Sequence, residues 1–157
     1  MNSAHPTGTS RLLRLFDHNS RQQFLIDTGA EISVFPARRP DRLRKSSTTL
    51  RAANNSLIHT YGYKQLTLEL GLPRPLTWRF IIADVTQPII GADFLLQHKL
   101  LVDLEQKRLI DTRNGTRLQA ELSSDSLFNS TTSLPHRLRP LSTTVEGISI
   151  SNDAMHN

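Results

Sequence analysis

The chain of 157 residues contains no cysteine. This absence excludes a disulfide framework, a thiol nucleophile and a cysteine-based zinc site. None of the six histidines shows the spacing that is typical of metal ligands. We therefore expect a function that needs neither a metal nor another cofactor.

Long hydrophobic runs are also lacking. The sequence has no apolar segment of membrane-spanning length, and no apolar stretch follows Met1 as it would in a signal peptide. These absences predict a cytoplasmic protein with no membrane partner. A sustained helical period is missing as well, because apolar residues alternate over short segments or form short runs. The pattern predicts an all-β fold with one short helix at 93–98.

Composition divides the chain into three parts. Residues 1–10 are rich in Ser, Thr, Pro and Gly and predict a flexible N-terminus. Residues 11–111 contain the patterned segments and predict one folded domain. Residues 112–157 are rich in Ser and Thr and predict a disordered linker or tail. The expected strands are 11–16, 21–26, 31–35, 50–53, 57–63, 65–72, 76–85, 89–90, 100–104 and 107–111.

The most informative segment is Phe24–Ala30, in which an apolar strand delivers Asp27 to a turn. A carboxylate in such a place can share a proton with a second carboxylate and activate a water. The hydroxyl of Thr28 can lock the loop, and Gly29 leaves room for a close backbone approach. Ala30 is small enough to lie beside a substrate. Taken alone, the same short pattern is also typical of an ordinary β-turn.

A second Asp-Thr-Gly or Asp-Ser-Gly does not occur in the sequence. The nearest match is Asp111-Thr112-Arg113, where arginine stands in the place of the glycine. The chain therefore carries one such motif, and a second carboxylate would have to come from a second copy of the chain, which predicts a homodimer.

Farther along the chain, Ile89-Ile90-Gly91 opens the expected helix. With the Asp27 motif, this segment resembles the retropepsin family, the aspartic peptidases of retroviruses and LTR retrotransposons. Over roughly residues 11–111 the chain is most similar to the protease segment of a gypsy-type retrotransposon polyprotein. The resemblance implies a retropepsin-like closed β-barrel. It also implies an aspartic endopeptidase that processes a Gag-Pol polyprotein, in the cytoplasm or within virus-like particles.

The resemblance also implies roles for further residues. Thr28 would clamp two loops across the dimer axis, although it could merely cap the turn. Ile90 and Gly91 would support the catalytic loop. A hairpin flap would cover an extended peptide with apolar residues at the cleaved bond. The expected flap tip is Ala53, Asn54, Asn55 and Ser56, which an ordinary hairpin would also explain, and the expected apolar subsite walls are Ala30, Ile32, Leu50, Ile58 and Ile90.

This chain departs from the family after each motif. Many retroviral enzymes pair an aspartate after Asp-Thr-Gly-Ala with an arginine after the second glycine, and these positions hold Glu31 and Ala92 here. We expect Asp93 to cap the helix and not to replace that ion pair.

Two questions stay open at the level of sequence. The net charge is +5, and basic residues cluster from Arg38 to Lys45. This loop could make a weak RNA contact, or it could be an ordinary solvated loop. The chain as a whole could also be a catalytically silent binding module with the retropepsin fold, or the product of a decayed retroelement.

Overall fold

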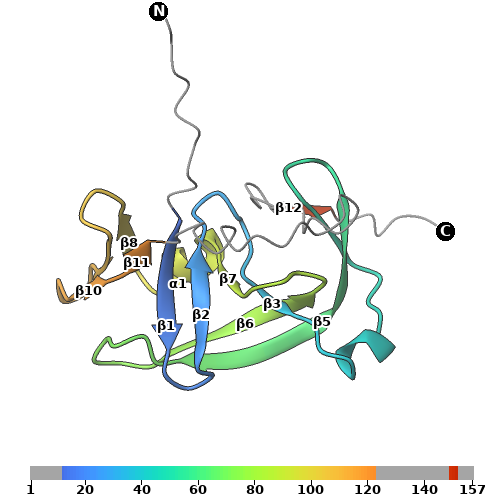
Figure 1. Ribbon diagram of the computed structural model, residues 1–157, viewed down its shortest axis with the longest axis horizontal. Helices are drawn as coiled ribbons and strands as arrows, with labels where there is room; N and C mark the ends of the chain where they lie inside the picture. The colour runs from blue at the N-terminus through green and yellow to red at the C-terminus, as the bar shows by residue number, and fades with distance from the viewer. Residues whose placement is uncertain (1–11, 123–148, 152–157) are drawn as a thin grey trace, which may run out of the picture.

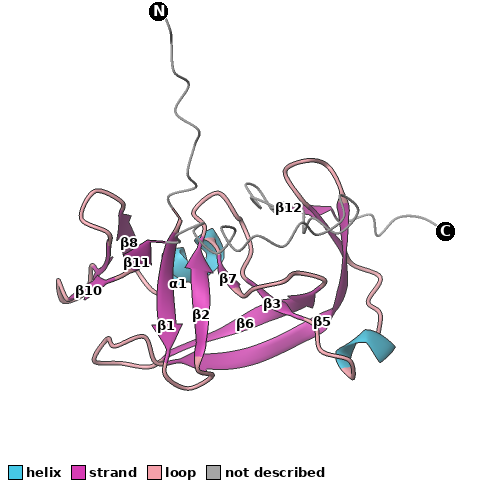
Figure 2. Ribbon diagram, viewed as in Figure 1, coloured by secondary structure: helices cyan, strands magenta, loops and turns pink. Residues whose placement is uncertain are grey.

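The computed structural model describes residues 12–122 and 149–151, which are mostly β-structure (Figures 1 and 2). One helix, α1 (Ala92–Gln97), and one short 3-10 turn, η1 (Asp41–Leu43), complete the described elements. Neither is long and apolar enough to cross a membrane. The strands are β1 (Leu13–Asp17), β2 (Gln22–Ile26), β3 (Val34–Pro36), β4 (Thr49–Arg51), β5 (Leu57–Leu68), β6 (Leu76–Ala83), β7 (Ile89–Ile90), β8 (Leu100–Asp103), β9 (Arg108–Asp111), β10 (Arg117–Gln119), β11 (Glu121–Leu122) and β12 (Ser149–Ser151).

The described strands form two sheets. The larger has nine strands in the order β11-β1-β2-β7-β3-β6-β5-β4-β12, and the smaller has the order β10-β9-β8. Most pairs are antiparallel, but β2 with β7 and β3 with β6 are parallel. Because β11 and β12 lie at opposite ends of the larger sheet, the pairing does not close on itself. The prediction of mostly β-structure with one short helix is confirmed, whereas the expected closed barrel is not found among the described strands.

The folded body extends past the predicted boundary at residue 111. Strand β10 pairs with β9, and β11 pairs with β1 through Leu13 and Leu122. Leu118 and Ala120 pack on the main core. The prediction of a tail from residue 112 is therefore wrong for 112–122, since strands of two or three residues are too short to show a period of two. The remaining tail assignments, 1–10, 123–148 and 152–157, lie outside the described residues.

Two strands that each contain an unbroken apolar run, 24–26 in β2 and 80–83 in β6, separate the two hydrophobic clusters. In β2, Phe24 and Ile26 belong to one cluster and Leu25 to the other. In β6, Phe80 and Ile82 are likewise divided from Ile81 and Ala83. Successive side chains of a strand point to opposite faces, so both runs are covered on both sides. A continuous apolar run predicts this arrangement.

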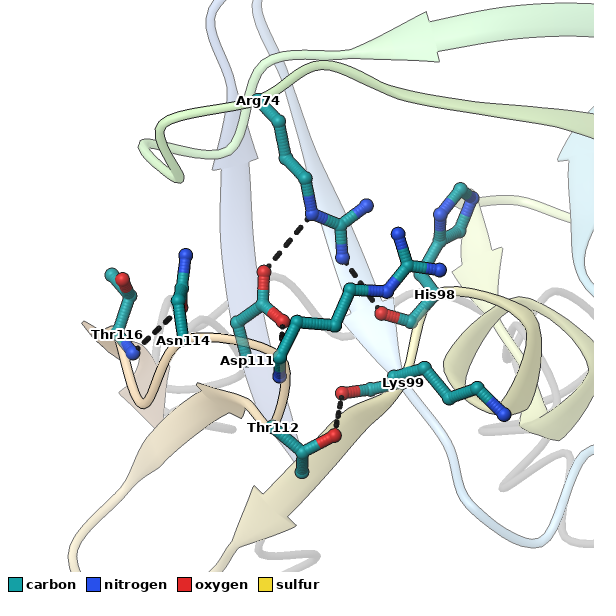
Figure 3. Close-up of polar contacts among 8 residues, drawn as sticks. Arg74, His98, Lys99, Asp111, Thr112, Asn114 and Thr116 are labelled. Atoms are coloured by element: carbon teal, nitrogen blue, oxygen red, sulfur yellow. Dashed lines mark hydrogen bonds and ion pairs between the residues drawn. The ribbon is translucent and has the colours of Figure 1, made fainter.

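A polar contact joins three parts of the fold that are distant in sequence (Figure 3). Arg74, in the turn before β6, donates from Nε to Asp111 Oδ2 at 3.0 Å and from Nη2 to the His98 carbonyl at 2.7 Å. The carboxylate of Asp111 is fully buried and also accepts the backbone N–H of Arg113. Burial raises the pKa of Asp111, but the hydrogen bonds from Arg74 and Arg113 and their positive charges outweigh it, and the pKa lies below its ordinary value. Asp111, the aspartate of the nearest match to a second Asp-Thr-Gly, is thus part of a structural ion pair.

Candidate active site

Asp27 directly follows β2 and is held by the neighbouring parallel strand β7. Leu25 pairs with Ile89, and Ile26 pairs with Ile90. The backbone N–H of Asp27 continues this ladder by donating to the Ile90 carbonyl at 3.0 Å. The residue is 3% exposed. The two motifs that the sequence singles out therefore lie side by side.

The loop turns tightly around the carboxylate. The N–H of Gly29 donates to Asp27 Oδ1 at 3.0 Å, and the N–H of Ala30 donates to the Asp27 carbonyl at 3.2 Å. Thr28 and Gly29 are exposed, while Ala30 is completely buried. The loop is thus anchored at Ala30 and presents Thr28 and Gly29 on the surface.

The segment after β7 packs directly beneath this loop. The N–H of Ala92 donates to the Ala30 carbonyl at 2.7 Å, and the N–H of Asp93 donates to the Glu31 carbonyl at 3.2 Å. A Cβ atom on Gly91 would lie 2.7 Å from the Ala30 carbonyl oxygen and 2.8 Å from that of Ile32. Position 91 therefore has no space for a side chain.

A polar network behind the loop was not foreseen from the sequence. Ser33 is completely buried and donates from its N–H (3.1 Å) and its hydroxyl (2.6 Å) to Asp93, and its oxygen accepts the N–H of Gly91. Trp78 donates from Nε1 to the same carboxylate at 3.1 Å. These contacts connect the loop, the helix and β6. A serine in an expected strand gave no signal, because the partners are brought together only by the fold.

The expectation that Asp93 caps the helix needs correction. The N-cap position is Gly91, which has no side-chain cap, and Asp93 lies in the first helical turn. Its Oδ1 does accept the N–H of Phe94 at 2.7 Å. The carboxylate thus serves the helix N-terminus and the Ser33 and Trp78 donors together.

The expected flap tip is a tight turn without glycine. Asn55 adopts the left-handed conformation, with φ of 68°, which asparagine tolerates better than most residues. Asn54 Oδ1 accepts both the N–H and the hydroxyl of Ser56, and Arg51 donates to Asn55 Oδ1 at 3.0 Å. Ala53 is exposed, as are the three residues that follow it. The tip is therefore held by its own side chains at the end of the β4–β5 hairpin.

Most of the predicted subsite walls are buried. Ala30, Leu50 and Ile58 belong to the cluster that packs the hairpin against the loop, and Ile90 belongs to the main core. Only Ile32, of these five, is partly exposed, beside an open pocket of about 460 Å³ that Trp78 and Asp93 also line. In this structure four of the five predicted wall residues are therefore core residues.

Within 12–122, no group of three or more His, Asp or Glu side chains could hold a metal ion.

The basic loop from Arg38 to Lys45 is largely exposed, and Arg42 lies 3.7 Å from Asp84 in an ion pair. Asp84 also accepts the hydroxyl of Tyr61 at 2.8 Å, a hydrogen bond that raises the pKa of that phenol.

Comparison with known proteins supports the fold. No protein-family model matches the chain, and no curated protein matches it either. Among solved structures, the retroviral protease-like domain of Ddi1 from Leishmania major matches 73% of this chain and 96% of that domain, with a TM-score of 0.54 and 16% identity. At this identity the likeness concerns the fold alone, and the chain has a fold similar to that of a retroviral protease-like domain.

Proposed function

We propose that the chain is an aspartic endopeptidase that acts as a homodimer, with one Asp27 from each subunit. The observation that carries this proposal is the loop after β2. Asp27 is held there by two hydrogen bonds, from its own N–H to the Ile90 carbonyl and from the Gly29 N–H to its carboxylate. Thr28 and Gly29 lie at the surface. A retroviral protease-like fold supports the same reading, because such a domain provides half of a two-fold site.

The chemistry follows from two carboxylates placed close together. Two like charges at short range cannot both ionise cheaply, so the pair retains one proton. The ionised Asp27 takes a proton from a bound water, which attacks the scissile carbonyl. The protonated Asp27 of the other subunit donates to the carbonyl oxygen. In the resulting tetrahedral intermediate, the Asp27 that took the water's proton gives it to the leaving nitrogen, the other Asp27 takes back a hydroxyl proton, and the C–N bond breaks without a covalent enzyme intermediate.

The substrate we propose is an extended polypeptide with apolar residues at the cleaved bond. Such a segment binds by adding a strand to an exposed sheet edge. The biological role proposed is the processing of a retrotransposon Gag-Pol polyprotein, in the cytoplasm or within virus-like particles. Contact of the loop from Arg38 to Lys45 with RNA stays a prediction from its charge.

The test is cleavage of a library of fluorogenic extended peptides by the purified full chain. Asp27→Asn removes the acid–base group and should lower kcat/KM by at least about 10²-fold, with an unchanged thermal transition. Glu105→Gln, the same change at an exposed turn residue, should retain full activity. Cleavage that survives in Asp27→Asn would refute the assignment. Peptide binding without any cleavage by the wild-type chain would instead favour a binding module.

A further inference from the structure

Strand β12 pairs with the hairpin that carries the expected flap tip. It lies antiparallel to β4, with Ser149 opposite Arg51, Ile150 opposite Leu50 and Ser151 opposite Thr49. The other edge of β4 pairs with β5. Since β12 ends the nine-stranded sheet, β4 is the outermost strand on this side among residues 12–122.

The hairpin belongs to the surroundings of Asp27. Leu50 of β4 and Ile58 of β5 are paired and share a buried cluster with Ala30 of the catalytic loop. In Figure 1, β12 and the loop after β2 are drawn toward the same side of the molecule. The edge of β4 is therefore an unpaired strand edge close to the candidate site in any state that lacks β12.

An incoming extended peptide and β12 would use the same backbone groups. Strand addition satisfies the N–H and C=O groups along one edge, and an edge can hold one added strand at a time. We propose that Ser149–Ser151 occupy, within their own chain, the edge of β4 at which an extended peptide substrate binds, and compete with it. This inference rests on the proposed function for the identity of the competing peptide.

The strength of the competition depends on the length of β12 and on its covalent attachment to the same chain. A strand of three residues forms few ladder hydrogen bonds, so a longer peptide can displace it. Tethering nevertheless keeps the segment at a high effective concentration. If the edge is free in about a tenth of molecules, the apparent Kd of a peptide is about tenfold weaker than its intrinsic value. The segment would act as a built-in competitor that a good substrate overcomes.

The test compares two full-chain variants. Ser149→Pro/Ile150→Pro/Ser151→Pro removes all three N–H donors of β12, whichever of them face β4. The control, Ser142→Pro/Thr143→Pro/Thr144→Pro, makes the same change elsewhere in the tail. The probe is a fluorescein-labelled hexapeptide of valine and leucine, with a lysine at each end and a reduced central peptide bond that no peptidase can cleave. Anisotropy gives its Kd, and hydrogen exchange reports the amides of 49–51.

The β12 variant should bind the probe about tenfold more tightly than the wild-type chain and lose amide protection at 49–51, while the control changes neither. Equal Kd values, or unchanged protection, would overturn the inference. A difference that varies with protein concentration would place the segment on a second copy and would overturn the intramolecular assignment. If the β12 variant binds the probe more tightly but no variant cleaves peptides, the competition by β12 is supported and the proposed peptidase activity is refuted.

Discussion

Gly91 shows how a single residue permits the candidate site to form. The backbone of the loop after β2 passes so close that a Cβ would lie within 2.8 Å of two carbonyl oxygens. The resemblance to retropepsins implied this contact, because in that family the glycine of the second motif lies under the loop of the first. It did not predict the Ser33–Asp93–Trp78 network, because no local pattern relates residues that are 15 to 60 positions apart.

At Gly91, alanine should destabilise the fold. The methyl group must push apart backbone atoms of the loop and not the end of a flexible side chain. Overpacking of this kind reduces the free energy of unfolding by about 1–3 kcal/mol. Urea unfolding of Gly91→Ala measures the loss, and an unchanged midpoint would show that the loop can move away without cost.

At Asp93, alanine should also weaken the attachment of the helix to the loop. It removes the acceptor of the Ser33 hydroxyl, the Ser33 N–H and the Trp78 indole, and we expect a loss of about 2–3 kcal/mol. Trp78→Phe removes a single donor and should have a smaller effect. Trp78 is the one tryptophan of the sequence, so its fluorescence reports this network. An emission spectrum of Asp93→Ala identical to that of the wild-type chain would contradict the role of Asp93.

At the scale of the element, apolar pattern determined which strands could be predicted. Strand β6 and the β8–β9 hairpin were expected from an apolar run or from alternation, and only their ends shifted. The two expected strands 57–63 and 65–72 form the single strand β5. The expected strand 31–35 is reduced to β3 at 34–36, because the segment before it belongs to the loop after β2. Strands β10, β11 and β12 were missed, since they lie in the Ser/Thr-rich segment after residue 111, where two or three residues carry too little pattern, whereas the equally short β7 was expected from its place in the Ile89-Ile90-Gly91 motif. The order of strands in the open sheet depends on contacts between elements that are distant in sequence, so no single segment could predict it.

The Arg74–Asp111 contact predicts a specific dependence on pH. The pKa of Asp111 is lower in the folded chain than in the unfolded chain. Its contribution is therefore present above the unfolded pKa, near 3.9, and is lost as the pH falls through the folded pKa. Arg74→Met should reduce the free energy of unfolding by about 1.5–3 kcal/mol at pH 7, because the buried Asp111 carboxylate loses a charged hydrogen-bond donor. The difference in the free energy of unfolding between Arg74→Met and the wild-type chain should become smaller as the pH falls, because Asp111 then loses its charge.

A second ion pair in the same part of the fold provides the control. Arg108 and Asp103 also lie 3.0 Å apart, but both side chains remain more than a fifth exposed. Arg108→Met should therefore change stability by less than about 1 kcal/mol. Unfolding titrations from pH 7 to pH 2 compare the two variants, and equal losses would show that burial does not set the strength of the Arg74 contact.

At the scale of the whole molecule, a half-site makes activity depend on association. If two subunits supply the two Asp27 carboxylates, the active fraction falls as the chain is diluted below its dimer dissociation constant. Specific activity should therefore fall with dilution, in parallel with the dimer fraction measured by sedimentation. Specific activity that stays constant into the monomeric range would mean that one chain suffices.

The parallel pairing of β2 with β7 has a consequence in time. Leu25 and Ile89 are neighbours in space but are separated by most of the folded body in sequence. During synthesis, Asp27 leaves the ribosome long before the strand that holds it, and non-local pairs of this kind form slowly. A nascent chain that stops short of Gly91 thus carries the Asp27 loop without its support. If the chain is the proposed peptidase, the order of translation delays its activity until the domain is nearly whole.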